Sequence, residues 1–236
     1  MKILAIDSSG LVASVAITED DVLLGEYTID YKKTHSQTLL PMLDELKRML
    51  EMDMDSIDAI AVAAGPGSFT GLRIGSATAK GLGLALHKPL IAVPTVDGLA
   101  MNLWGCRTDI CPLMDARRNQ TYTGIYRFDE DCRLFVVEPQ CAVDIMDIIA
   151  KINANNQEVT FLGDGVPVFR ETIEREVKVP FVFAPAGINR QRASALALLG
   201  AQYYAEGRTV SAEDFRPDYL RLSQAERERL EKEKTC

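Results

Sequence analysis

The stretch between positions 65 and 75, which reads GPGSFTGLRIG, has the residue types and spacing best suited to chemistry. An apolar run precedes it, and a long run of small and apolar residues follows. Gly65 and Gly67 allow a sharp turn, and Ser68 or Thr70 can cap the helix that follows. A strand, a glycine turn and a capped helix place backbone N–H groups where an anion binds. An ordinary strand-to-helix turn is the alternative for this stretch.

Asp7 is a second candidate, because it ends the first apolar segment and is followed by small hydroxyl residues. A carboxylate in that position can orient a phosphate or a metal-bound water. A turn aspartate that accepts backbone N–H groups has the same sequence pattern. The residues that we expect to contact a nucleotide or phosphate are Asp7, Ser8, Ser9, Gly65, Gly67 and Ser68.

The pattern of side chains supports neither a metal site nor a nucleophile. His35 begins a helix, and a metal pair would need a second ligand three or four residues later, where Thr38 and Leu39 stand. The other histidine, His87, lies far along the chain. The sequence has no Ser/His/Asp string, P-loop or GxGxxG motif. We therefore expect no metal site and no catalytic residue.

Composition is typical of an acidic globular protein of the cytoplasm. The chain has 236 residues, is 47% hydrophobic and 25% charged, and carries a formal charge of -8. This charge argues against autonomous binding of nucleic acid, which requires a basic surface. The first residues lack the pattern of a signal peptide, and no apolar stretch reaches the length of a membrane span. The five scattered cysteines indicate free thiols in a reducing cytoplasm.

Strands and helices alternate along the chain, which predicts an α/β fold. We expect strands over residues 2–7, 12–17, 22–31, 57–64, 90–93, 110–114, 121–128, 134–137 and 159–162. We expect helices over residues 34–52, 70–86, 96–104, 145–152 and 192–204, and a charged helix over 224–234. Each half opens with a strand that ends in aspartate, Asp7 or Asp115, which favours a duplicated fold with a cleft between two lobes.

The predicted helix over residues 70–86 is rich in small residues at four-residue spacing. One row comprises Gly71, Gly75, Ala79 and Gly83, and a second comprises Ala77, Gly81 and Ala85. Glycine in a helix interior costs about 1 kcal/mol relative to alanine, so the small residues indicate a close approach by another backbone. One row is expected to pack on its own sheet. The second row favours another close neighbour, either the helix over 34–52 or a partner protein.

Several of these segments together resemble the bacterial TsaB (YeaZ) family. The matching strings cover most of the chain and read MKILAIDSS, THSQTLLPMLDELK, AVAAGPGSFTGLRIGSATAKGLGLAL, DARRNQTY, GDG and PDYLR. The resemblance implies an actin/Hsp70-like (ASKHA) ATPase fold, with two related lobes of mixed sheets flanked by helices. We expect the N-terminal lobe over residues 1–104, the C-terminal lobe over 105–210, and a tail over 211–236 that partly returns to the first lobe.

The same resemblance implies a role in making threonylcarbamoyladenosine, the modified base beside the anticodon of tRNA. TsaB-like proteins are similar to TsaD but act as its non-catalytic partner, and Leu39 stands here where TsaD has the second histidine of its metal pair. Expected partners are TsaD and the small ATPase TsaE, with tRNA bound only through the complex and a homodimer when the chain is alone. No cofactor is expected beyond weak ATP or ADP binding. Residues expected near a helix-on-helix interface with TsaD are His35, Leu39, Leu43, Leu46, Gly71, Gly75 and Ala79.

We make a separate prediction for Arg117 and Arg118, because they follow the end of a strand in an acidic protein. They either contact tRNA, a nucleotide or a carboxylate, or form a structural salt bridge within the second lobe. Two other classes of function are alternatives. A metallopeptidase would require a bound divalent metal, and an ASKHA-type kinase or ATPase would use Asp7 as its base.

Overall fold

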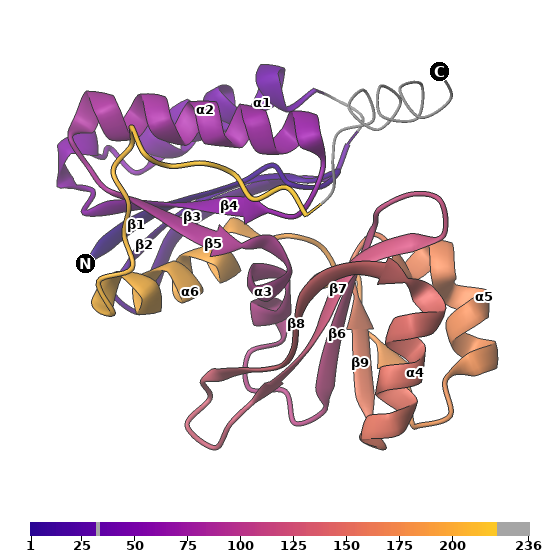
Figure 1. Cartoon of the computed structure of the whole chain (residues 1–236). Coiled ribbons are helices and arrows are strands. Elements are labelled where there is room, and N and C mark those ends of the chain that lie inside the picture. The colour runs from indigo at the N-terminus through magenta and orange to yellow at the C-terminus, as the bar shows by residue number, and fades with distance from the viewer. Residues whose placement is uncertain (32–33, 221–236) are drawn as a thin grey trace, which may run out of the picture.

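A computed structural model describes residues 1–31 and 34–220, which form two lobes, each built on a five-stranded mixed sheet (Figure 1). The first lobe contains β1 (Lys2–Asp7), β2 (Ala13–Glu19), β3 (Val22–Ile29), α1 (His35–Met49), a 3-10 helix (Met54–Ser56), β4 (Ala59–Gly65), α2 (Phe69–Leu86) and β5 (Leu90–Pro94). The second lobe contains β6 (Asp109–Asp115), β7 (Gln120–Phe128), β8 (Leu134–Asp144), α4 (Ile145–Asn155), β9 (Val159–Leu162), α5 (Val166–Glu176) and β10 (Phe181–Phe183). The connecting helices are α3 (Thr95–Ala100), the 3-10 helix Met101–Leu103, and α6 (Ala193–Ala205).

The two sheets share one topology. The strand order is β3-β2-β1-β4-β5 in the first sheet and β8-β7-β6-β9-β10 in the second. In each sheet the first three strands form an antiparallel meander, and the last two are parallel to the first. A glycine with positive φ stands at the end of the fourth strand of each lobe, Gly65 at 119° and Gly163 at 108°. The repeated order confirms the expected ASKHA fold of two related lobes.

The first lobe has three layers, with α1 and α2 on one face of its sheet and α6 on the other (Figure 1). Side chains of β1 alternate between the faces, so Leu4 and Ile6 pack beneath α1 and α2, while Ile3 and Ala5 pack against the α6 side. By sequence, α6 lies in the range 105–210 assigned to the second lobe. In the structure it packs on β1, β2 and β5 of the first sheet.

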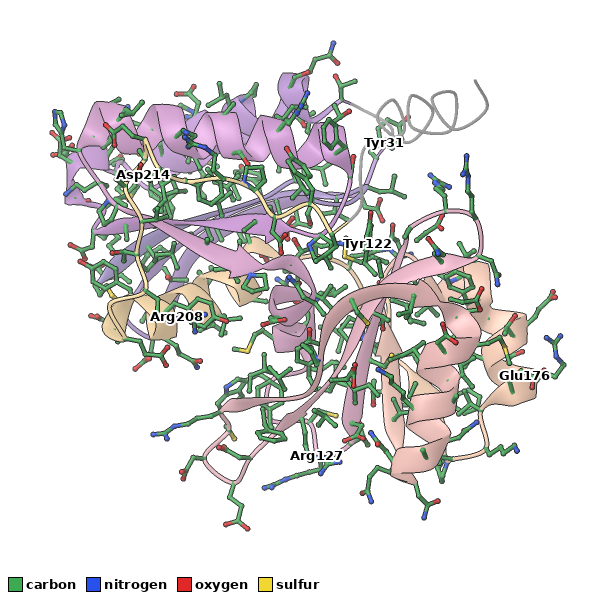
Figure 2. The ribbon with its side chains drawn as sticks, viewed as in Figure 1. Tyr31, Tyr122, Arg127, Glu176, Arg208 and Asp214 are labelled. Carbon is green, nitrogen blue, oxygen red and sulfur yellow. The ribbon has the colours of Figure 1, made fainter. Side chains whose placement is uncertain are left out.

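The segment after α6 also returns to the first lobe. Val210 exchanges two backbone hydrogen bonds with β5, each 2.9 Å long. Phe215 is 1% exposed and belongs to the core between the sheet and α2. Figure 2 shows Asp214 on this segment, alongside α2. At its end the Asp218 N–H donates to the carbonyl of Ala64 (2.6 Å). The segment therefore runs the length of the lobe, from β5 to the turn before α2.

Several elements differ from those expected. Helix α1 covers His35–Met49 rather than 34–52. Strand β8 runs through Pro139 to Asp144, because an edge strand tolerates a residue that lacks the N–H. Helix α5 and strand β10 were not predicted, and the helix expected over 224–234 lies outside the described residues. No helix in residues 1–31 and 34–220 is long and apolar enough to span a membrane. The four cysteines within those ranges are free thiols.

Candidate functional site at the start of helix α2

The turn after β1 packs directly on the start of α2. The Asp7 carboxylate accepts hydrogen bonds from the backbone N–H (2.9 Å) and the hydroxyl (2.6 Å) of Ser9. Burial raises the pKa of Asp7, and the bonds from Ser9 oppose that shift. The Ser9 carbonyl accepts from the Ser68 N–H (2.6 Å), and the Ser8 hydroxyl donates to the Gly71 carbonyl (2.9 Å). Turn and helix are thus joined by hydrogen bonds in both directions.

Glycine is required where this turn meets the helix. A Cβ added to Gly67 would lie 2.3 Å from the Ser9 carbonyl oxygen, and one added to Gly71 would lie 2.0 Å from that of Ser8. A Cβ on Gly75 would lie 2.6 Å from the Ser8 hydroxyl. The row of small residues that begins at Gly71 therefore provides the space in which the turn is seated.

The six residues expected to contact a phosphate lie together, and their polar groups bond to one another and to neighbouring residues of the same lobe. The Ser68 hydroxyl caps α2 by accepting from the Gly71 N–H (3.3 Å). The Gly65 N–H donates to the Thr95 hydroxyl (3.1 Å), and the hydroxyl of Ser9 serves Asp7. For Asp7, these contacts are the ones expected of a turn aspartate that accepts a backbone N–H group. Nucleotide binding at this turn stays a prediction.

His35 holds the same turn from the other side. Its Nε2 donates to the carbonyl of Gly10 (2.9 Å), and its buried Nδ1 has no hydrogen-bond partner among the described residues. One helical turn later, Leu39 is 1% exposed and lies in the core. The described part of the chain contains no group of three or more His, Cys, Asp or Glu side chains that could hold a metal.

Six of the seven residues expected near the partner interface are buried within the first lobe. Helices α1 and α2 turn these residues toward their own sheet and toward the turn after β1. Their place near a partner interface stays a prediction. The apolar spacing identified the buried face of each helix, but the neighbour on that face is the lobe itself. The six are Leu39, Leu43, Leu46, Gly71, Gly75 and Ala79.

The second row of small residues on α2 is exposed to solvent. Ala77, Gly81 and Ala85 are exposed, and we call these three residues the small-residue face. A Cβ added to Gly81 meets no atom of the described residues within 4 Å. Leu84 beside it is 47% exposed, and Leu40 on the neighbouring α1 is 54% exposed. The outer side of the two helices therefore combines small and large apolar residues.

Arg117 and Arg118 lie in the turn between β6 and β7, the counterpart of the turn after β1. The Arg117 guanidinium lies 2.9 Å from the Asp115 carboxylate and is 80% exposed. Both arginines have positive φ, 65° and 55°. Burial raises the pKa of Asp164, which follows β9 in this lobe. Arg117 thus forms an ion pair within its own turn. Contact of either arginine with RNA or a nucleotide stays a prediction.

Known proteins similar to this chain include several that are named for threonylcarbamoyladenosine synthesis. Residues 23–229 match the family model of TsaD, described as tRNA N6-adenosine threonylcarbamoyltransferase. The tRNA threonylcarbamoyladenosine biosynthesis protein TsaB of Bacillus subtilis is 35% identical over 99% of this chain and 100% of its own length. The TsaB of Escherichia coli is 28% identical over 94% of this chain and 95% of its own.

Solved structures give the same result. YeaZ from Pseudomonas aeruginosa superposes with a TM-score of 0.78 and 26% identity, over 93% of this chain and 99% of the other. A further crystal structure, of an uncharacterized protein with similarity to peptidase YEAZ from the same species, gives a TM-score of 0.81 at 26% identity, with the same coverage of both chains. With the full-length match to named relatives, the chain belongs to the TsaB (YeaZ) family of tRNA threonylcarbamoyladenosine biosynthesis proteins.

Proposed function

We propose that this chain is a non-catalytic subunit in threonylcarbamoyladenosine synthesis, and that it acts by pairing with a TsaD-type paralogue through α1 and α2. The observation that carries the proposal is the small-residue face. Glycine at position 81 costs the helix about 1 kcal/mol relative to alanine, and within residues 1–31 and 34–220 no atom lies where its side chain would stand. Packing within the lobe therefore does not account for this glycine.

An external helix would account for it. Rows of small residues let two helix backbones approach closely, and large apolar side chains beside the row supply the buried area of the contact. Leu84 and Leu40 lie exposed on the same two helices. An apolar core is typical of homodimer interfaces. The same face would serve a homodimer of this chain when the paralogue is absent.

Other parts of the proposal follow from this assignment. The paralogue holds the metal and the reacting groups, and this chain supplies no catalytic residue. TsaE and tRNA bind to the pair rather than to this chain alone, since a net charge of -8 offers no basic surface of its own. The complex works in the cytoplasm, and any ATP or ADP binding by this chain alone is weak.

Light scattering on mixtures of this chain with the TsaD-type protein of the same organism tests the pairing. Ala77→Leu fills the small-residue face, and Ala154→Leu places the same change at an exposed position of α4 in the second lobe. Both variants keep their core, so both should fold. We expect a heterodimer for wild type and Ala154→Leu, and monomers for Ala77→Leu. An intact heterodimer with Ala77→Leu, or no wild-type complex, would contradict the proposal.

A further inference from the structure

A cavity of about 660 Å³ lies between the two lobes, on the side of α6 rather than that of α1 and α2 (Figure 1). Its walls come from α3, from the C-terminal half of α6 with the residues just after it, and from the start of β8. The volume is in the range of small-molecule sites, which commonly lie where domains meet and combine apolar walls with a few polar groups. None of the residues expected at the turn before α2, at the partner interface or in the turn after β6 lines this cavity.

Asp97 brings a carboxylate from α3 to the wall of this cavity. The hydroxyl of Tyr126, a fully buried residue of β7, donates to its Oδ1 (2.7 Å) and fixes the side chain. Burial raises the pKa of Asp97, while the Tyr126 bond and the charge of Arg208 oppose that shift. Arg208 acts at a distance, because within residues 1–31 and 34–220 no cation lies in ion-pair contact with Asp97. A largely buried carboxylate without a paired cation is unfavourable, and a bound cation would relieve that cost.

Two exposed arginines line the same cavity. Arg208 follows α6 (Figure 2), and its guanidinium stacks on the ring of Tyr203, with Cζ 3.3 Å from the ring centroid. Its Nη1 lies 3.3 Å from the exposed carboxylate of Glu206. Arg133 precedes β8, and its backbone N–H donates to the side chain of Asp129 (2.8 Å). Because an exposed ion pair such as Arg208–Glu206 contributes little, both guanidinium groups are available to another anion.

The other walls of the cavity are aliphatic. Leu134 and Val136 reach it from β8, and Leu199 reaches it from α6. Val136 is 41% exposed, so apolar surface is left uncovered there, and its contact with an aliphatic group would be favourable. The cavity therefore offers a carboxylate without a counter-ion, two guanidinium groups and an aliphatic surface.

We propose that this cavity binds an α-amino acid with an aliphatic side chain. Asp97 bonds the ammonium group, Arg208 and Arg133 bond the carboxylate, and the β8 side chains cover the aliphatic group. A simple amine would be repelled by the two arginines, and a simple carboxylate by Asp97, whereas a molecule with both charges avoids either repulsion. The inference does not depend on the pairing proposed above, because α1 and α2 lie on the other face of the first sheet.

Isothermal titration of the full chain tests the site, with L-leucine as the probe. Asp97→Asn removes the charge but keeps the Oδ1 acceptor for Tyr126, so this variant should fold. Asp21→Asn makes the same change at an exposed position in the turn after β2. We expect L-leucine to bind wild type and Asp21→Asn equally, and to bind Asp97→Asn about tenfold more weakly or worse, as for the loss of one hydrogen bond between charged groups.

Two analogues of leucine test the two charges separately. The first, 4-methylpentanoate, lacks the ammonium group, and the second, 3-methylbutylamine, lacks the carboxylate. Each should bind wild type about tenfold more weakly than L-leucine or worse, because each leaves one side of the site without its partner.

Three results would overturn the site: no binding of L-leucine at millimolar concentration, equal binding by Asp97→Asn, or equal binding of either analogue. If Asp97→Asn fails to fold, Val136→Trp gives the second variant, since a large ring at this exposed strand position should fill the cavity and abolish binding. Unchanged affinity of Val136→Trp for L-leucine would also overturn the site.

Discussion

Changing glycine to alanine should destabilise the chain in one row of small residues on α2 and stabilise it in the other. In Gly71→Ala the new methyl group would lie 2.0 Å from the Ser8 carbonyl oxygen, where ordinary contact begins near 3.4 Å. That carbonyl belongs to a turn held by the Ser9–Ser68 hydrogen bond, so it cannot swing aside as a side chain would. Overpacking costs about 1–3 kcal/mol, and collision with backbone favours the upper value. Against a gain of up to about 1 kcal/mol in helix propensity, the net loss is about 2 kcal/mol.

Gly81→Ala is the matched control, because its methyl group meets nothing within 4 Å in the part of the chain that the structure describes. It should stabilise the chain by about 1 kcal/mol through helix propensity alone. The two variants should therefore differ by about 3 kcal/mol in unfolding free energy, or about 6–12 °C in Tm for a chain of this size. Urea and thermal unfolding of the isolated chain measure this difference. Variants within about 1 kcal/mol of each other would refute the assignment of the two rows.

Two further changes test the turn and the returning segment. Burial raises the pKa of Asp7, so its carboxyl stabilises the fold most below its ordinary pKa, and this contribution is lost as pH rises through the raised value. Asp7→Asn keeps the Oδ1 acceptor for Ser9 and should gain stability relative to wild type from about pH 4 upward. If the difference in unfolding free energy between this variant and wild type is the same at pH 4 and pH 7, the prediction is wrong. Phe215→Ala should cost about 3–5 kcal/mol, because the ring is 1% exposed in the core under α2. A loss below about 1 kcal/mol in urea unfolding would show that the returning segment is not part of that core.

Apolar spacing predicted which faces of α1 and α2 are buried, but it could not identify what buries them. The oxygen that requires glycine at position 71 belongs to Ser8, 63 residues earlier in the chain. That neighbour is created by the parallel pairing of β1 with β4, which brings the turn after β1 to the start of α2. The row that begins at Gly71 is therefore internal. The row that stays open, with Gly81, has the same spacing in the sequence.

Elements whose apolar residues show no clear helical or strand spacing were the hardest to predict from the sequence. Helix α6 is apolar on most sides, because it is buried between the first sheet and the core beside α3, so amphipathic spacing does not show which lobe it covers. Strand β10 has only three residues and forms by pairing with β9. No sequence pattern predicted the burial of Gln191, because a polar residue between two arginines is typical of an exposed loop. In the structure Gln191 is 1% exposed and its amide lies against Gly10, more than 180 positions away in the sequence.

The returning segment has a consequence for the order in which the protein matures on the ribosome. Chains emerge from the N-terminus at about 5–20 residues per second, and domains usually fold as they emerge. Here Phe215 and Ala212, which complete the core beneath α2, are synthesised after the whole second lobe. The first lobe is translated first but cannot complete its core until Phe215 has been synthesised. The second lobe, whose strands and helices are contiguous, is complete earlier, so truncated products should contain a formed second lobe beside an unfinished first one.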